Sequence, residues 1–150
     1  ASTGPVPEDP DFSIPFGKAN IVRSGKDVTV IAIGTMLPKA VSAAQKLASQ
    51  GIDLEIIDPR TLVPLDKQTL IDSVAKTSRV IIAHEAHVRS GPGAEIAAML
   101  AEEAIEYLDG PVLRIGAKNV PLPYSPELEN FVLPSEEDIV KAVRSLAGKS

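Results

Sequence analysis

Short apolar runs rich in β-branched residues alternate along the chain with stretches whose apolar residues recur at helical spacing. An almost unbroken run such as Val28–Ile33 is typical of a strand that is buried on both faces of a sheet. Comparable runs cover residues 19–22, 52–57, 80–83 and 112–115. The alternation therefore predicts about five strands separated by helices, the pattern of a mainly parallel sheet.

The intervening stretches predict helices through their apolar spacing and their end signals. The first has an apolar face from Ala40 to Ala48 and a stop signal at Gly51. Asp66 is placed to cap a second helix, and residues 94–108 predict a third. Residues 135–138 resemble a capping box at the start of the last helix. Right-handed crossovers put helices on both faces of a parallel sheet, so the predicted fold class is α/β with three layers, α/β/α.

Composition fits one globular domain and narrows the possible functions. The chain has 150 residues, 44% of them hydrophobic and 23% charged, and it has no cysteine, which excludes a disulfide framework and a thiol nucleophile. The net charge is -5 and the basic residues are scattered, so we expect no nucleic-acid partner. No apolar run approaches the roughly 18 residues of a membrane span.

Four prolines and three acids in residues 1–15 predict an extended arm or interdomain linker, which leaves residues 16–150 as the domain.

The segment from His84 to Glu95 carries the densest group of reactive side chains, where a predicted strand runs into a predicted helix. Ligands of open parallel sheets bind beyond the carboxyl ends of the strands, so one interpretation is an acid–base site, a metal site or an anion site. The interpretation that we favour is structural. In it, Gly91 and Gly93 permit a tight entry into the helix, while His84 and Glu85 satisfy buried backbone groups or lie in an interface.

A second segment joins a predicted strand to the helix that Asp66 caps. Asp58 and Arg60 have the chemistry of an ion pair or of a carboxylate-binding fork. We favour the alternative that Pro59 and Pro64 shape the connection and that Arg60 pairs locally or across a subunit boundary.

A third segment, residues 120–129, contains three prolines, which force an extended path. Its Tyr124 is either an interface anchor or part of a loop that covers one end of the sheet. No serine lies in a Gly-x-Ser-x-Gly elbow. The residues by themselves therefore indicate an α/β domain without a recognisable reaction centre.

Four segments stand in order and with characteristic spacing over about residues 12–147: Ile14–Ala19, Glu55–Asp66, His84–Glu85 with Gly93–Ile96, and Pro121–Tyr124 with Leu128–Glu129. Together they resemble the transketolase C-terminal domain family. The last of the four resembles a segment that is typical of the beta subunits of 2-oxo acid dehydrogenases within that family. Pro59 departs from the pattern, because relatives commonly have leucine or another apolar residue there.

The resemblance implies a part of a larger enzyme. Whole enzymes of this group are α2β2 assemblies that oxidatively decarboxylate a 2-oxo acid with thiamine diphosphate and magnesium, and the cofactor lies between two domains other than this one. We therefore expect no catalytic, cofactor-binding or metal-binding residue here. The residues expected to support a neighbouring site or to lie in an interface are His84, Glu85, Arg60, Asp58 and Tyr124.

The resemblance also implies an association and docking role, without catalysis by the isolated domain. The implied partners are the rest of the beta subunit, the alpha subunit, a second beta subunit and the peripheral subunit-binding domain of the acyltransferase component, in bacterial cytoplasm or the mitochondrial matrix. It implies that the first strand runs antiparallel to the others, and it favours pyruvate or acetoin as substrate. Two alternatives are a domain of another transketolase-like enzyme and an independent small-molecule-binding module.

Overall fold

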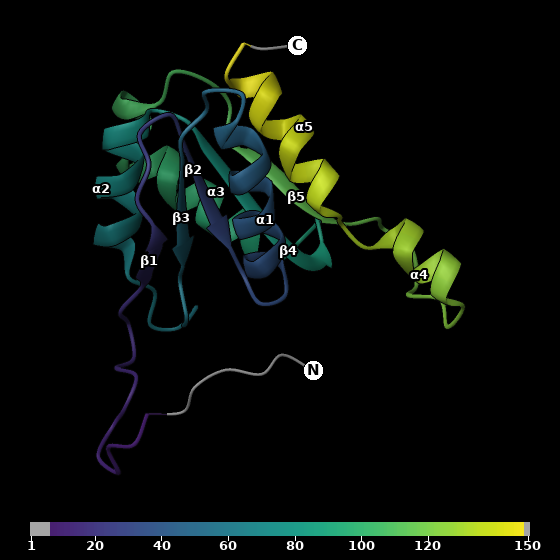
Figure 1. Ribbon diagram of the computed structural model, residues 1–150, viewed down its shortest axis with the longest axis horizontal. Helices are drawn as coiled ribbons and strands as arrows, with labels where there is room; N and C mark the ends of the chain where they lie inside the picture. Colours follow the sequence, from purple (N-terminus) through teal and green to yellow (C-terminus); the bar gives the residue numbers. More distant parts are fainter. Residues whose placement is uncertain (1–6, 149–150) are drawn as a thin grey trace.

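The computed structural model describes residues 7–148, which form one five-stranded sheet with helices on both faces (Figure 1). The sheet order is β1-β3-β2-β4-β5; β1 runs antiparallel to β3, and the other neighbouring pairs are parallel. The predicted three-layer α/β fold with one antiparallel strand is confirmed. The strands are β1 (Asn20–Arg23), β2 (Val28–Ala32), β3 (Leu54–Asp58), β4 (Val80–His87) and β5 (Leu113–Ala117).

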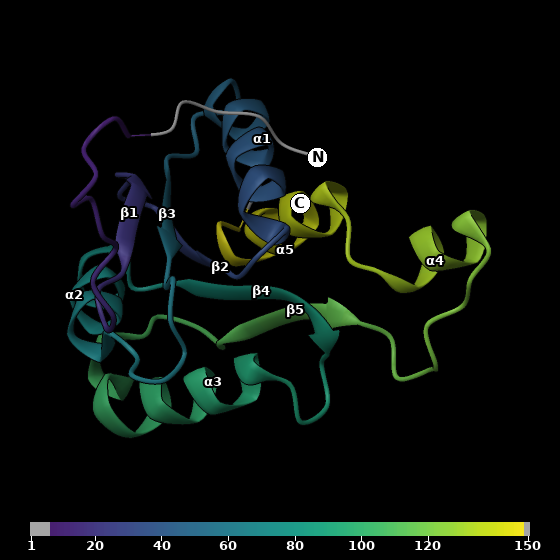
Figure 2. The same cartoon turned by 90° about the horizontal axis from the view of Figure 1, so that it is seen from below.

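Two helices pack on each face of the sheet. Helices α1 and α5 cover one face, and α2 and α3 cover the other, whereas α4 projects from the body beyond β5 (Figure 2). None of the helices in the described part of the chain has the length and apolar character needed to cross a bilayer. The helices are α1 (Met36–Ala48), α2 (Lys67–Thr77), α3 (Pro92–Glu103), α4 (Pro126–Val132) and α5 (Glu136–Leu146), with a short 3₁₀ turn, η1 (Ile105–Tyr107).

Successive side chains of each unbroken apolar run point to opposite faces of the sheet. In β2, Val30 packs under α1 and α5, and its neighbour Ile31 packs under α2 and α3. Ile56 and Ile57 of β3 divide in the same way, and all four side chains are fully buried. Both faces of the sheet therefore carry a hydrophobic core, as the β-branched runs predict.

The predicted helix starts are confirmed in atomic detail. Asp66 caps α2 by accepting hydrogen bonds from the backbone N–H and the hydroxyl of Thr69. Ser135 and Asp138 form a reciprocal capping box at α5. The predicted helix over residues 94–108 is too long, because the chain leaves α3 after Glu103 and turns towards β5.

Two elements differ from the sequence prediction beyond β4 and β5. Strand β4 continues to His87, which pairs with Ala117 of β5, so His84 and Glu85 lie on a strand rather than in a loop. Residues 126–132 form the short helix α4, because Pro126 stands at its first turn, where proline costs no hydrogen bond. The predicted arm, residues 1–15, lies partly outside the described residues. Residues 7–15 are exposed and form neither helix nor strand, and their linker role stays a prediction.

Candidate functional site at the carboxyl edge of the sheet

The loops that follow the parallel strands meet at one edge of the sheet, and the segment before β1 joins them because β1 is antiparallel. We call this the carboxyl edge; it consists of residues 7–19, 33–35, 59–66, 88–91 and 118–135. The opposite, amino edge consists of residues 24–27, 49–53, 78–79 and 104–112. All three segments singled out in the sequence therefore converge on the carboxyl edge.

His84 is a buried packing residue rather than an open acid–base group. Its side chain is 1% exposed, and its Nδ1–H donates to the carbonyl oxygen of Ala86 at 3.0 Å. A Cβ atom placed on Gly93 would lie 2.5 Å from the Nε2 of His84, and one placed on Gly91 or Gly116 would lie 2.9 Å from its Cε1. The three glycines therefore make room for the imidazole, which accounts for the spacing of Gly91 and Gly93 without any bound anion.

The surroundings of His84 favour the neutral form of its imidazole. Burial lowers the pKa of His84, the positive charge of Arg114 lowers it further, and the hydrogen bond to Ala86 opposes both effects. The Nε2 atom is buried and has no hydrogen-bond partner among residues 7–148. The favoured interpretation, in which His84 satisfies a buried backbone group, agrees with this geometry.

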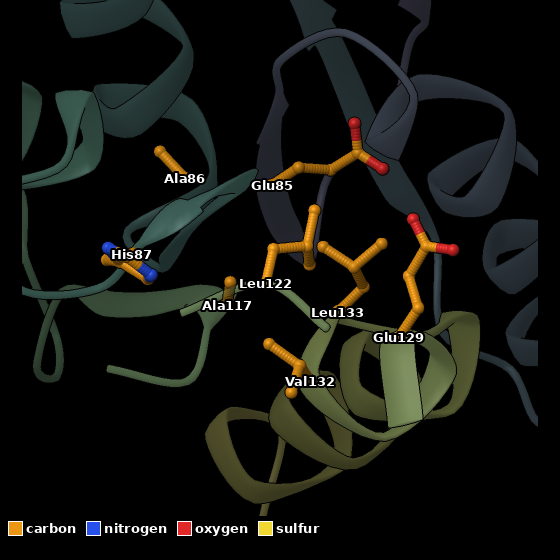
Figure 3. Close-up of a pocket in the computed structure, with 8 residues that line it drawn as sticks. All are labelled: Glu85, Ala86, His87, Ala117, Leu122, Glu129, Val132 and Leu133. Carbon is orange, nitrogen blue, oxygen red and sulfur yellow. The ribbon is translucent and has the colours of Figure 1, made fainter. Parts of the chain in front are cut away.

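A cleft of about 410 Å³ separates the end of β4 from α4 (Figure 3). The carboxylates of Glu85 and Glu129 lie on the same side of this cleft, and Leu122, Val132 and Leu133 form its apolar floor. The cleft is completed by Ala86, His87 and Ala117. Its lining is mainly apolar and carries two carboxylates, and its outer wall is the projecting arm, residues 118–135.

The two histidines do not share a site. His87 hydrogen-bonds through Nε2 to the carbonyl oxygen of Val120 at 3.1 Å, whereas His84 is enclosed by glycines. No group of three or more His, Asp or Glu side chains placed to hold a metal ion occurs among residues 7–148.

The second segment fastens the start of the domain to the sheet. Asp58 and Arg60 do meet, but through the backbone N–H of Arg60, which donates to the Asp58 carboxylate at 2.9 Å, and not through the guanidinium. The hydroxyl of Thr61 accepts from the N–H of Gly17 at 3.0 Å, and Asp66 accepts from the N–H of Ala19 at 2.9 Å. Thr61 and Asp66 therefore hold the chain that enters β1 in place by hydrogen bonds.

The carboxylate of Asp66 is stabilised in its charged form. Burial alone would raise the pKa of Asp66, but the hydrogen bonds from Ala19 and Thr69 outweigh that effect and lower it. Glu55, the first residue of the same motif, is fully buried and accepts hydrogen bonds from the side chains of Ser73 and Lys76. Both acids hold elements of the fold together.

Tyr124 and its neighbours present apolar surface to solvent. The side chain of Tyr124 is fully exposed (103%), and Phe131 of α4 is 67% exposed with the ammonium of Lys118 3.1 Å from its ring centroid. Glu129 and Phe131 were not singled out as site residues from sequence. Their signal is the short helix that follows Pro126, whose pattern is too brief for a periodicity argument.

Comparison with known proteins decides the family. Residues 17–139 match the model for the transketolase C-terminal domain. The chain belongs to this family. A structure described as a split gene transketolase, inactive beta4 tetramer, superposes with a TM-score of 0.79 at 32% identity and covers 95% of this chain and 46% of that one.

Relatives with higher identity include two proteins that are named as beta subunits. The pyruvate dehydrogenase E1 component subunit beta of Rhizobium meliloti (strain 1021) is 44% identical over 144 residues, which is 96% of this chain and 31% of the relative. The acetoin:2,6-dichlorophenolindophenol oxidoreductase subunit beta of Bacillus subtilis (strain 168) is 43% identical over 146 residues, 97% of this chain and 42% of the relative. The resemblance to this branch of the family is confirmed, and the chain spans less than half the length of these relatives.

Proposed function

We propose that this chain is the association domain of the beta subunit of a thiamine-diphosphate-dependent 2-oxo acid dehydrogenase, and that it has no catalytic activity alone. The substrate of the whole enzyme is proposed to be pyruvate or acetoin, in keeping with the named relatives. Thiamine diphosphate and magnesium would bind outside this domain. The relatives are more than twice as long as this chain, so the whole enzyme has other domains that could hold the cofactor. The compartment would be bacterial cytoplasm or the mitochondrial matrix.

The observation that carries the proposal is the uneven distribution of exposed apolar side chains. Ile105 and Tyr107 are the large hydrophobic residues exposed at the amino edge among the described residues, and β1 adds Ile21 and Val22. The carboxyl edge exposes many more, which is typical of a surface that another protein part covers. They are Phe12, Ile14, Phe16, Leu62, Val63, Val120, Leu122, Tyr124, Leu128 and Phe131.

The shape of the arm supports the same conclusion. Helix α4 has 7 residues, fewer than the roughly 12–15 that an isolated helix needs to be stable in water. Its contact with the domain runs through the buried Val132, whereas Leu128 and Phe131 are exposed. A helix of this kind gains stability when a neighbour packs on its outer face.

The proposed neighbours are the rest of the beta subunit, the alpha subunit, a second beta subunit and the peripheral subunit-binding domain of the acyltransferase component. The similar split gene transketolase is described as an inactive tetramer of beta chains. A chain that contains a domain of this fold therefore associates without being active, which supports an assembly role over a catalytic one.

Calorimetry and assembly measurements test the proposal. Thiamine diphosphate with magnesium, titrated into the 150-residue chain, should give no binding heat, and the chain should not turn over pyruvate or acetoin. A deletion variant of the beta subunit that lacks residues 16–150 should fail to assemble with the alpha subunit, as measured by sedimentation velocity. Stoichiometric cofactor binding by the short chain, or normal assembly of the truncated subunit, would refute the proposal.

A further inference from the structure

We infer that the cleft between the end of β4 and α4 receives a lysine or arginine side chain from an apolar segment of a different polypeptide chain. This inference rests on the proposed association function and names the chemistry of one partner. The inference is based on a chemical match: the cleft has an apolar lining and two carboxylates, and a long basic side chain has one part that suits each. Lysine and arginine combine an apolar stem with a cationic head.

The charge of the cleft is unbalanced within the domain. The carboxylates of Glu85 and Glu129 are half-buried, and neither has an ion pair or a hydrogen-bond partner among residues 7–148. Two other glutamates in the described chain are paired: Glu103 with Lys67, and Glu136 with Lys46. Two like charges that face one half-buried cleft are stabilised when a cation lies between them.

The apolar half of the cleft favours a side chain over a free metal ion. Leu122, Val132 and Leu133 line the cleft to one side of the carboxylates (Figure 3), and these side chains offer no ligand to an ion. The exposed Leu128 and Phe131 extend the apolar surface along α4 outside the cleft. A basic residue flanked by apolar residues would cover both regions at once.

Two other occupants fit the charges and the topology less well. A second copy of this chain, in a two-fold contact of arm against arm, would bring Glu85, Glu127 and Glu129 towards the same acids of its partner. The described part of the chain's own N-terminal arm is held at the end of β3 by Thr61 and Asp66, on the opposite side of the carboxyl edge. These two occupants are outcomes that the experiment below distinguishes.

The first measurement is assembly of the full-length beta subunit with its alpha subunit as a function of ionic strength. The Glu85→Gln/Glu129→Gln variant should weaken assembly about 10-fold at low ionic strength, and the difference should shrink at high ionic strength. The matched control, Glu106→Gln/Asp109→Asn, makes the same charge change at two exposed positions of the amino edge and should stay within about 2-fold of the wild type. Equal effects of both variants, or no effect of either, would overturn the inference.

The second measurement identifies the occupant directly. A photocrosslinking amino acid in place of Leu128, which is 55% exposed beside Glu129, is introduced into the full-length subunit, and the assembled complex is irradiated and analysed by mass spectrometry. We expect a cross-link to a segment of another polypeptide that has a lysine or arginine between apolar residues. A cross-link to the same chain, to a second copy of this subunit, or to a segment without a basic residue would overturn the inference.

Failure of this inference is separable from failure of the proposed function. If glutamine at both positions leaves assembly intact while acidic substitutions of Leu128 and Phe131 abolish it, the arm is an interface but the cleft holds no basic side chain. If neither pair of substitutions affects assembly, the association role of the arm is itself wrong.

Discussion

The two edges of the sheet are built in contrasting ways. At the amino edge the loops are short and bind one another: the N–H of Asp53 donates to the Asp27 carboxylate at 2.7 Å, Arg23 pairs with Asp53 at 2.8 Å, and the N–H of Asp109 donates to Ser78 at 2.8 Å. At the carboxyl edge the segments are longer, and the large apolar side chains of the arm and of residues 12–16 and 62–63 remain exposed. The amino edge is joined by its own hydrogen bonds and an ion pair, whereas the carboxyl edge leaves large apolar side chains in contact with solvent.

The largest expected effect compares matched apolar positions on the two edges. Leu128→Asp/Phe131→Asp in the full-length beta subunit should weaken its assembly about 100-fold, because charged groups would replace the apolar face of α4 in an interface. Ile105→Asp/Tyr107→Asp alters side chains of similar exposure at the amino edge and should change assembly less than about 3-fold.

Sedimentation velocity of the purified subunits gives both dissociation constants. All four side chains are exposed, so the unfolding free energy of the isolated chain should change little in either variant. Similar losses of assembly for the two pairs would show that the contrast between the edges has no functional meaning.

A second comparison uses two glycines. Gly93→Ala would place its Cβ 2.5 Å from the buried ring of His84, so this overpacking should lower the unfolding free energy by about 2–3 kcal/mol. A Cβ on Gly110, at the amino edge, would lie 3.7 Å from Leu146, an ordinary contact distance. Gly110→Ala should therefore change the unfolding free energy by less than about 0.5 kcal/mol. Urea unfolding measures both values, and a well-tolerated Gly93→Ala would contradict the packing role assigned to His84.

A third test concerns the clamp on the entering chain. Asp66→Ala removes the cap of α2 and the hydrogen bond to Ala19, and should cost about 2 kcal/mol of unfolding free energy. Asp66→Asn keeps a side-chain oxygen at the cap and should cost about half as much. Amide hydrogen exchange at Ala19 should become faster in the alanine variant; unchanged exchange there would show that Asp66 does not hold the chain that enters β1.

The smallest expected effect is a pH dependence from His84. Its folded-state pKa is lowered, so the unfolded chain binds more protons as the pH falls below about 6.5, and stability is lost from there down to the folded-state pKa. The contribution is fully present above the unfolded-state pKa, and the loss is at most about 1.4 kcal/mol per pH unit. Comparing the slopes of wild type, His84→Gln and the control His87→Gln isolates the effect; equal slopes in all three would exclude it.

The sequence predicted the elements whose signals are local. The β-branched run of Val28–Ile33 predicted a strand buried on both faces, and Asp66 and Ser135 predicted helix starts, because each signal depends on residues within one element. The candidate residues at the carboxyl edge were found in the same way, since they follow strands. Their roles were not readable: the sequence left an ion pair between Asp58 and Arg60 open as an alternative, and the structure shows a hydrogen bond from the backbone N–H of Arg60 instead.

Predictions failed where distant residues decide the structure. The end of β4 is polar, and it continues to His87 because it pairs with Ala117 of β5, thirty positions along the chain. The cage around His84 needs Gly116 from β5 as well as the nearby Gly91 and Gly93. No spacing rule within a single segment contains that information.

The amino-acid pattern by itself determined the family, the order of strands and helices along the chain, and the edge of the sheet where the candidate residues gather, because motifs, periodicity and caps act over a few residues. Tertiary structure alone decided that His84 is enclosed while Glu85, one residue later, faces an open cleft. Successive side chains of a strand point to opposite faces, and what each face meets depends on elements that are remote in sequence.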